Sequence, residues 1–304
     1  MFRKSIQSLS LSLTWSFALA APFISGAAQA QNPPGNLPTP YALAAGLDLE
    51  CRPAQGAPPT ANVVLRQLNP VLKDKIPAQN AQLGGLNEVC VPVSKNGQLP
   101  PANALAIDRW VDLSCFDAEA APISVDVKVS HLNPQLIGLP DENITLTRLE
   151  QVCLPVKKNG AEPESAVVKQ IIAHFDFACY GLAEPTSDVN NTLILSHLNP
   201  VIKQMNPPDR TVTMRRAHQL CVPIAKDNQP VPAPVRPLVQ WIDFLKYRVE
   251  PAQQPPVLPL WLTHLNPLYA GQDPYFTTLS PDRMRLMVPI AKDGHLPPGA
   301  PGHD

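Results

Sequence analysis

The sequence lacks a block of like charges. Charged residues make up only 16% of the chain, and the formal net charge is −1. Nucleic acids and anionic membrane surfaces are bound by basic patches, so we expect neither as a partner. Beyond residue 24 there is also no apolar run near the roughly 20 residues that cross a bilayer, which predicts no membrane span in the rest of the chain.

Catalytic and cofactor signatures are missing too. The chain contains no GxSxG, no HExxH, no phosphate-binding glycine loop and no dinucleotide fingerprint. The six cysteines include no CxxC pair and no clustered metal ligands, which argues against a redox or zinc site. We therefore predict a protein that is not an enzyme and holds no cofactor or metal, with an acid–base pair formed by distant residues left open.

The amino terminus has the composition of a secretory signal peptide. Arg3 and Lys4 precede an apolar run from 9 to 24, and small residues at Ala28 and Ala30 form a cleavage site. We predict cleavage after Ala30. The mature protein is then secreted or periplasmic, where disulfides form and persist.

One five-residue phrase occurs four times at nearly even intervals. Two further landmarks keep the same order around it: an aspartate-led run that ends in cysteine in three copies, and a closing run of the type Cys-Val-Pro-Val-x-Lys-Asn-Gly. Such a repeat, of about 65 residues, is the sequence signature of a tandem array. The phrase is found as RQLNP at 66–70, SHLNP at 130–134 and 196–200, and THLNP at 263–267.

Each copy has the pattern of β-structure. Val125, Val127 and Val129 alternate with polar residues, which is the period of a strand with one buried face. The 38 prolines exclude long helices, and Asn-Gly pairs after the closing runs predict turns. We predict an all-β protein of four tandem, small, disulfide-stapled modules, arranged as beads or a stack rather than as a four-bladed propeller. The expected divisions are 1–30 signal peptide, 31–44 Pro-rich lead, 45–104, 105–168, 169–235 and 236–297 for the modules, and 298–304 tail.

The repeat narrows the cysteine pairing. The fourth copy has Lys246 and Met287 where the others have cysteines, and joint loss is expected of two partners. The rival scheme joins adjacent copies and leaves Cys51 and Cys221 to pair across the molecule. We predict pairing within copies, which closes a loop of about 40 residues and stabilises a small module by roughly 4 kcal/mol. The predicted bridges are Cys51–Cys90, Cys115–Cys153 and Cys179–Cys221.

Three kinds of side chain are candidate sites. His131, His197 and His264 recur at one position, where Gln67 stands in the first copy; they are candidates for a metal, although a structural hydrogen bond explains His and Gln alike. The unbridged fourth module is rich in aromatic residues, which either replace the bridge by burial or form a sugar- or protein-binding surface. Its candidates are Trp241, Trp261 and Tyr275. We expect the repeated lysines to be solvated turn residues and the repeated aspartates to bond strand ends or turns; these are Lys95, Lys158, Lys226 and Lys292, with Asp48, Asp112, Asp176 and Asp243.

The third module carries a resemblance to known proteins. Its segments Phe175-Asp176-Phe177-Ala178-Cys179-Tyr180 and Leu220-Cys221-Val222-Pro223-Ile224-Ala225-Lys226 fit the pattern Cys-aromatic … Leu-Cys-x-Pro-x-x-Lys. This resembles an uncharacterised family of secreted bacterial proteins built from tandem two-cysteine β modules, and the likeness covers about residues 45–297. The resemblance implies export and fold, and no activity.

Together these features favour a secreted, non-enzymatic structural or binding protein. A carbohydrate- or metal-binding module is the alternative, and an enzyme ranks third. The partner is unknown from the sequence, with an extracellular protein or a glycan as the candidates.

Overall fold

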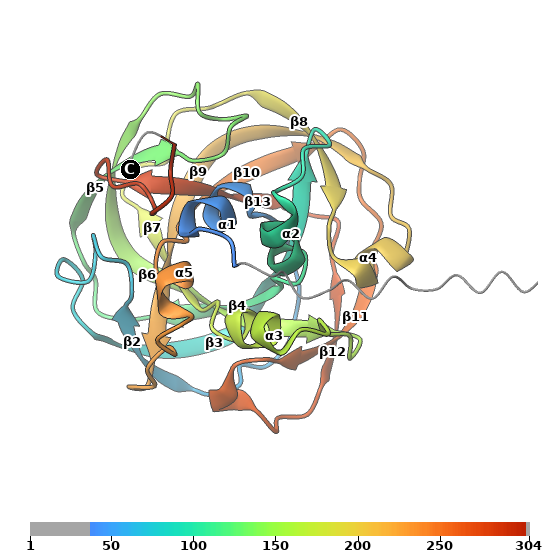
Figure 1. Ribbon diagram of the computed structural model, residues 1–304, viewed down its shortest axis with the longest axis horizontal. Coiled ribbons are helices and arrows are strands. Elements are labelled where there is room, and N and C mark those ends of the chain that lie inside the picture. Colours follow the sequence, from blue (N-terminus) through green and yellow to red (C-terminus); the bar gives the residue numbers. More distant parts are fainter. Residues whose placement is uncertain (1–36, 302–304) are drawn as a thin grey trace, which may run out of the picture. The chain divides into compact units, whose positions relative to one another are not determined.

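The computed structural model describes residues 37–301. The predicted signal peptide and residues 31–36 of the predicted Pro-rich lead lie outside the described residues. Each quarter of the described chain runs in the same order: a short helix, an inner strand, an outer strand and a long strand (Figure 1). The all-β class and the fourfold repeat are thus as predicted. The first two modules contain α1 (Pro40–Gly46), β1 (Asp48–Pro53), β2 (Asn62–Gln67) and β3 (Gln79–Lys95), then α2 (Ala102–Asp108), β4 (Leu113–Glu119), β5 (Val125–His131) and β6 (Glu142–Lys158).

The third and fourth modules add short helical turns after the outer strand. In the fourth module the long strand is split in two, and Arg283 between the halves has a positive φ of 46°. These modules contain α3 (Ala166–Ile172), β7 (Phe177–Leu182), β8 (Asn191–His197), α4 (Pro200–Gln204) and β9 (Arg210–Lys226), then α5 (Arg236–Val239), β10 (Phe244–Pro251), β11 (Leu258–His264), the 3-10 turn η1 (Pro267–Tyr269), β12 (Tyr275–Leu279) and β13 (Arg285–Lys292).

The inner and long strands form a closed ring of eight antiparallel strands. Within each module the inner strand pairs with the long strand, and it also pairs with the long strand of the preceding module. β13 then pairs with β1, which closes the ring. The modules are therefore not separate beads, because every two-stranded unit has edges that only its neighbours satisfy. The order around the ring is β1, β3, β4, β6, β7, β9, β10, β13.

The outer strands tie modules that are not neighbours in sequence. Each pairs first with its own long strand and then with the end of the long strand two modules away. The turn after that end adds two bonds: Ile194 N–H donates to Asn96 Oδ1 at 2.8 Å, and Asn96 N–H to the Ile194 carbonyl at 2.8 Å. Asn96 and Gly97 both have positive φ, as the predicted Asn-Gly turn requires. The crossing pairs are β2 with β9, β5 with β13, β8 with β3 and β11 with β6.

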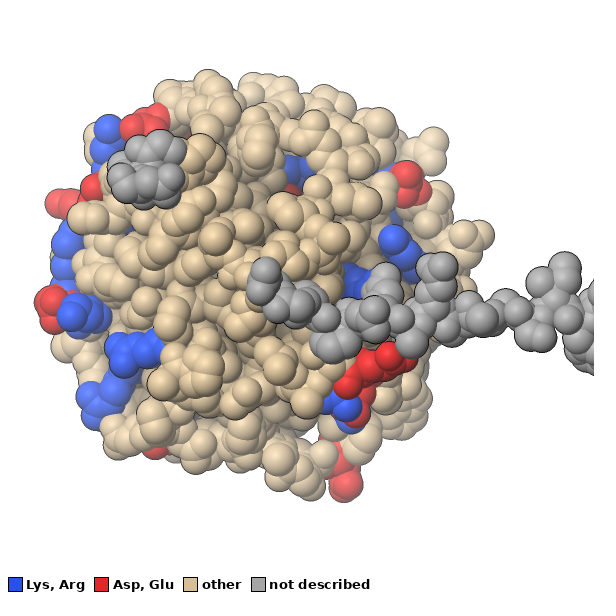
Figure 2. Space-filling view, viewed as in Figure 1, with Lys and Arg blue, Asp and Glu red and all other residues tan. Residues whose placement is uncertain are grey.

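Two apolar cores lie on the two faces of the closed sheet. One contains all six cysteines and the buried residues of α1, α2, α3 and α5, which Figure 1 shows grouped over the centre of the ring. The other lies between the ring and the outer strands and holds most of the valines and leucines. The helix-covered face is mostly uncharged at its centre, with charged side chains mainly toward its rim (Figure 2).

Candidate functional site

The repeated polar residues form four buried triads. In each module the lysine at the end of the long strand pairs with the aspartate before the inner strand. The asparagine in the LNP phrase of the following module donates its Nδ2–H to the same carboxylate. For example, Asn199 donates to Asp112 Oδ2 at 2.7 Å. The lysine expectation was wrong: the ends of the long strands are covered by outer strands from elsewhere, so these lysines are buried. The triads are Lys95–Asp48–Asn133, Lys158–Asp112–Asn199, Lys226–Asp176–Asn266 and Lys292–Asp243–Asn69.

These triads explain the LNP phrase. The asparagine Oδ1 accepts a hydrogen bond from the N–H two residues later in the chain; in the third module, Val201 N–H donates to Asn199 Oδ1 at 2.9 Å. The asparagine Nδ2 reaches the preceding module. Burial raises the pKa of Asp48, Asp112 and Asp243 to about 6, although each lysine partner lowers it. Burial likewise lowers the pKa of the partner lysines. The aspartates bond at strand ends, as expected, but their asparagine partners come from another module, so the triads also join modules, which the sequence did not predict.

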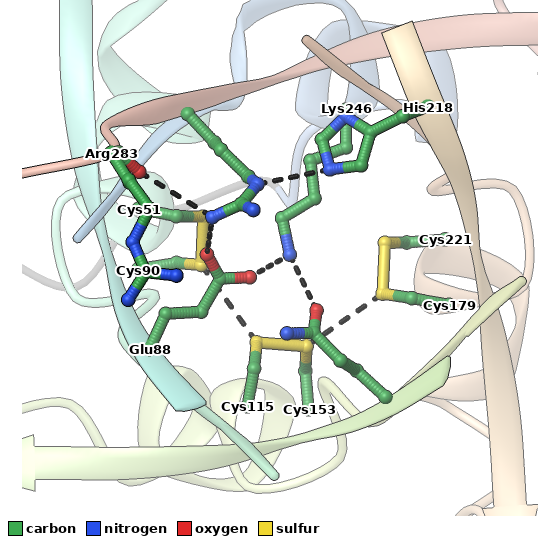
Figure 3. Close-up of a disulfide and its surroundings, with 12 residues drawn as sticks. Cys51, Glu88, Cys90, Cys115, Cys153, Cys179, His218, Cys221, Lys246 and Arg283 are labelled. Carbon is green, nitrogen blue, oxygen red and sulfur yellow. Dashed lines mark hydrogen bonds and ion pairs between the residues drawn. A yellow bond between two sulfur atoms is a disulfide. The ribbon is translucent and has the colours of Figure 1, made fainter. Parts of the chain in front are cut away.

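The interior of the ring holds the three disulfides (Figure 3). They are the three within-module bridges that the repeat predicts, and each joins directly opposed residues of an inner and a long strand. The bridges also touch one another: Cys90 Sγ lies 3.8 Å from Cys115 Sγ, and Cys153 Sγ lies 3.7 Å from Cys179 Sγ. Disulfides therefore occupy this level of the ring interior in three of the four modules.

Lys246 occupies the fourth quarter. It is directly opposite Met287, as the cysteines are opposite each other, and its Nζ points toward the other modules (Figure 3). It forms an ion pair with Glu88 and donates to Gln151 Oε1 at 2.7 Å. Burial, with a further contribution from Arg285, holds the pKa of Lys246 well below its usual value. A polar bridge to two other modules thus stands where a fourth disulfide would be.

Arg285 connects this interior to an open mouth of the ring. Its Nη1 lies 3.5 Å from Glu88 Oε2, and its Nε–H donates to His218 Nε2 at 2.9 Å. Burial, together with Arg285 and Arg248, lowers the pKa of His218 to about 3, so this imidazole is neutral and accepts the bond. His218 and Arg285 line two clefts that adjoin at the mouth.

Five arginines line the first cleft, which has a volume of about 720 Å³. We call it the arginine cleft. Two of its arginines are paired with acids: Arg216 Nη2 lies 3.0 Å from Asp188 Oδ2, and Arg215 Nε–H donates to Glu250 Oε2 at 2.8 Å. The guanidinium groups of two others have no hydrogen-bond or ion-pair partner within residues 37–301. These are the exposed Arg248 and Arg283.

The second cleft has the opposite character. It measures about 750 Å³, and its lining includes the three carboxylates of Asp117, Glu119 and Glu150 together with Arg148 and Arg285. We call it the acidic groove. Carboxylates and amides in such a groove accept hydrogen bonds from hydroxyl groups. The two clefts together present a strip that is basic at one end and hydrogen-bond accepting at the other.

The structure disperses the three repeated histidines. His131 Nε2 lies 3.1 Å from the Tyr247 hydroxyl, and His264 packs against Phe116, Tyr269 and Tyr275. His197 is buried with its own charged neighbours, chiefly Arg210. The three histidines have different neighbours, and within the described residues they do not form a common group of metal ligands. Within the described residues, the one group of potential metal ligands is Cys51, Glu88 and Cys90, whose cysteines are joined in a disulfide.

The three aromatic candidates are separated as well. Trp261 is 54% exposed and stacks edge to face on Phe276, its partner across β11 and β12. Tyr275 points the other way, and its hydroxyl lies 2.7 Å from Ser114 Oγ. Trp241 is half-buried beside α5. A flat row of all three is therefore absent, and none of them lines the arginine cleft or the acidic groove.

The arginine cleft was missed by sequence reasoning. Its arginines come from β9, β10, the segment before β13 and the start of β13, and they are not repeated between modules. One signal was available: the residue two before each closing landmark is polar. These are Glu88, Gln151, Gln219 and Arg285, which line the interior beside the sulfurs.

A scan against protein-family models, a search of curated proteins and a search of solved structures each found no match. Among the described residues, no helix has the length and apolar character needed to cross a membrane.

Proposed function

We propose that this protein is a non-enzymatic binding protein that works outside the cytoplasm, and that its arginine cleft and acidic groove together hold an acidic oligosaccharide. The carrying observation is the pair Arg248 and Arg283, two exposed guanidinium groups in one cleft with no partner among the described residues. Guanidinium binds carboxylates and sulfates in a bidentate manner, which gives both affinity and orientation. The three disulfides and the apolar amino terminus support secretion or a periplasmic location.

The acidic groove supports a sugar rather than a simple anion. An oligosaccharide with one acidic unit in the arginine cleft extends its hydroxyl groups into the groove, where Asp117, Glu119 and Glu150 accept hydrogen bonds. A purely anionic polymer is repelled there. We also propose that the chain belongs to the secreted bacterial family that its cysteine motifs resemble.

The test compares binding of a maltohexaose that carries a single uronic acid unit with binding of the neutral maltohexaose by calorimetry. The wild type binds the acidic sugar more tightly, and Arg248→Gln/Arg283→Gln lowers that affinity by about tenfold or more, with a shallower salt dependence. The matched control Arg66→Gln removes an exposed arginine of β2 that lies outside both clefts and leaves binding unchanged.

Two results contradict the proposal. One is equal binding of the two sugars, and the other is an affinity that the double variant leaves intact. A rise in reducing ends during incubation with either oligosaccharide contradicts the non-enzymatic part alone. Amino-terminal sequencing of the exported protein tests the location, with Gln31 as the expected first residue.

A further inference from the structure

A further cavity, separate from the arginine cleft and the acidic groove, lies beside α1 of the first module. It is about 230 Å³ in volume and opens between α1 and the loops that follow Lys95 and Asn133. We call it the α1 pocket. Its base is the triad Asp48, Lys95 and Asn133, and its walls are apolar. The wall residues that matter most here are Tyr41, Ala42, Ala45, Leu99 and Pro134.

The other modules explain why this pocket is open. Two residues before the triad aspartate, the four modules carry Gly46, Trp110, His174 and Trp241. The backbone at this place is the same in each, because the next N–H donates to the carbonyl three residues before it: Leu47 to Ala44 at 3.2 Å and Val111 to Asp108 at 3.0 Å, with Phe175 to Ile172 and Ile242 to Val239 at 3.2 Å.

In the third module the ring at this position lies near the triad. Lys226, the lysine of the third triad, lowers the pKa of His174 after burial has done so. Trp110 and Trp241 are half-buried at the matching places. A ring side chain thus occupies this position in three modules, whereas the first module has only Gly46. Pro100 takes up the space next to Gly46, since a Cβ there would lie 2.8 Å from the Pro100 Cβ, and both residues line the pocket.

We propose that the α1 pocket binds a free, small, planar aromatic compound of one or two rings, which takes the place that Trp110, His174 and Trp241 hold in the other modules. Its volume suits such a molecule. The apolar walls cover the ring faces, and the paired charges at the base present no net charge to them. Gln98 at the rim has no side-chain hydrogen bond to any described residue, so its amide is available for a ring N–H or O–H.

Indole is the probe for this site, followed by two-dimensional NMR of the full-length mature protein. Saturable shifts centred on Ala45, Gly46 and Gln98 are expected, at indole concentrations up to about 1 mM. Ala42→Phe places a ring inside the pocket and weakens binding tenfold or more. The matched control Ala106→Phe makes the same change at the corresponding place on α2, beside Trp110, and leaves binding intact.

Leu99→Glu provides a second variant that folds, because Leu99 is 59% exposed. It puts a charge in the pocket wall and also weakens indole binding. No saturable shift in the wild type overturns the proposal, and so does equal binding by Ala42→Phe and the wild type. Loss of binding in Ala106→Phe points to indole elsewhere and overturns it as well. None of these results depends on the arginine cleft, so they do not test the proposed binding of an acidic oligosaccharide.

Discussion

At the scale of single residues, the buried triads are the feature repeated most faithfully. A buried ion pair adds little net stability, since two charges lose their water, but breaking one by removing a partner is costly. Each triad joins two modules, because the asparagine comes from one and the lysine and aspartate from the module before it. Asn199 and Asp112 are 87 residues apart in sequence. The triads therefore specify which modules meet more than they stabilise the meeting.

Lys158→Met is expected to lower the free energy of unfolding by about 3–5 kcal/mol, because Asp112 is left buried without its cation. The double variant Lys158→Met/Asp112→Leu should recover part of this loss, since no buried charge remains. Urea unfolding at neutral pH measures both. Lys157→Met, at the more exposed neighbouring position, is the control and should change little. A double variant less stable than the single one would contradict this account.

The histidines make stability fall with acid. Burial first, and then Lys95, lowers the pKa of His131 from 6.5 to about 4. Below pH 6.5 the unfolded chain takes up a proton that the folded one refuses, so stability is lost as the pH falls from 6.5 toward 4. His131→Gln should remove this loss and gain about 2 kcal/mol relative to wild type at pH 4.5, with no gain at pH 7.5.

Glutamine suits this position, because Gln67 Nε2–H donates to the Tyr180 hydroxyl at 2.8 Å in the first module. Urea unfolding at the two pH values provides the measurement. The exposed His295→Gln serves as the comparison variant at both pH values. If His131→Gln gains as much at pH 7.5 as at pH 4.5, proton uptake is not the cause.

At the scale of elements, the sequence predicts the module well and its surroundings poorly. The alternation around Val127, the Asn-Gly turns and the joint loss of two cysteines are local or repeated signals, and the structure agrees with each. The burial of Lys95 was missed because its cover, β8, lies about 100 residues away. Nothing in the lysine's own neighbourhood distinguishes a solvated turn from a covered one.

The position of Lys246 allows a fourth disulfide to be built. Lys246→Cys/Met287→Cys places cysteines at directly opposed residues, as in the other modules, and Glu88→Gln removes the charge that Lys246 balanced. The triple variant should form the bridge, gaining up to about 4 kcal/mol from loop closure before packing losses. Mass spectrometry of unreduced peptides detects the link. Lys246→Ala/Met287→Ala/Glu88→Gln is the control, and free thiols at 246 and 287 in the folded triple variant would contradict the predicted geometry.

At the scale of the molecule, the closed ring matters more than any module. The sequence showed four copies but not how they join, because strand pairs such as β1 with β13 connect the two ends of the repeat region. The arginine cleft escaped for the same reason, as it exists only where β9, β10 and β13 meet. Repetition reveals units, whereas closure and single-copy sites depend on contacts distant in sequence.

Closure predicts tolerance of new chain ends. Tyr41 N–H donates to the Pro298 carbonyl at 3.1 Å, so the first and last described segments lie together. A circular permutant that links residue 301 to residue 37 and opens between Gly160 and Ala161 should fold with three disulfides and a melting temperature within several degrees of wild type. Opening between Val152 and Cys153 cuts a ring strand and should prevent folding. Circular dichroism and disulfide mapping decide, and equal behaviour of the two would contradict the closed ring.

Closure of the ring also fixes the number of modules that the protein can contain. In an open array a duplicated repeat adds one more link, and the rest is undisturbed. Here a fifth copy would have to part β13 from β1 and would change which outer strand meets which long strand, since each crosses to the second module along. Gain or loss of a single repeat is therefore disruptive. New properties are expected to arise through sequence differences among the four modules, such as Lys246 and Met287 at the positions where the other modules have a disulfide.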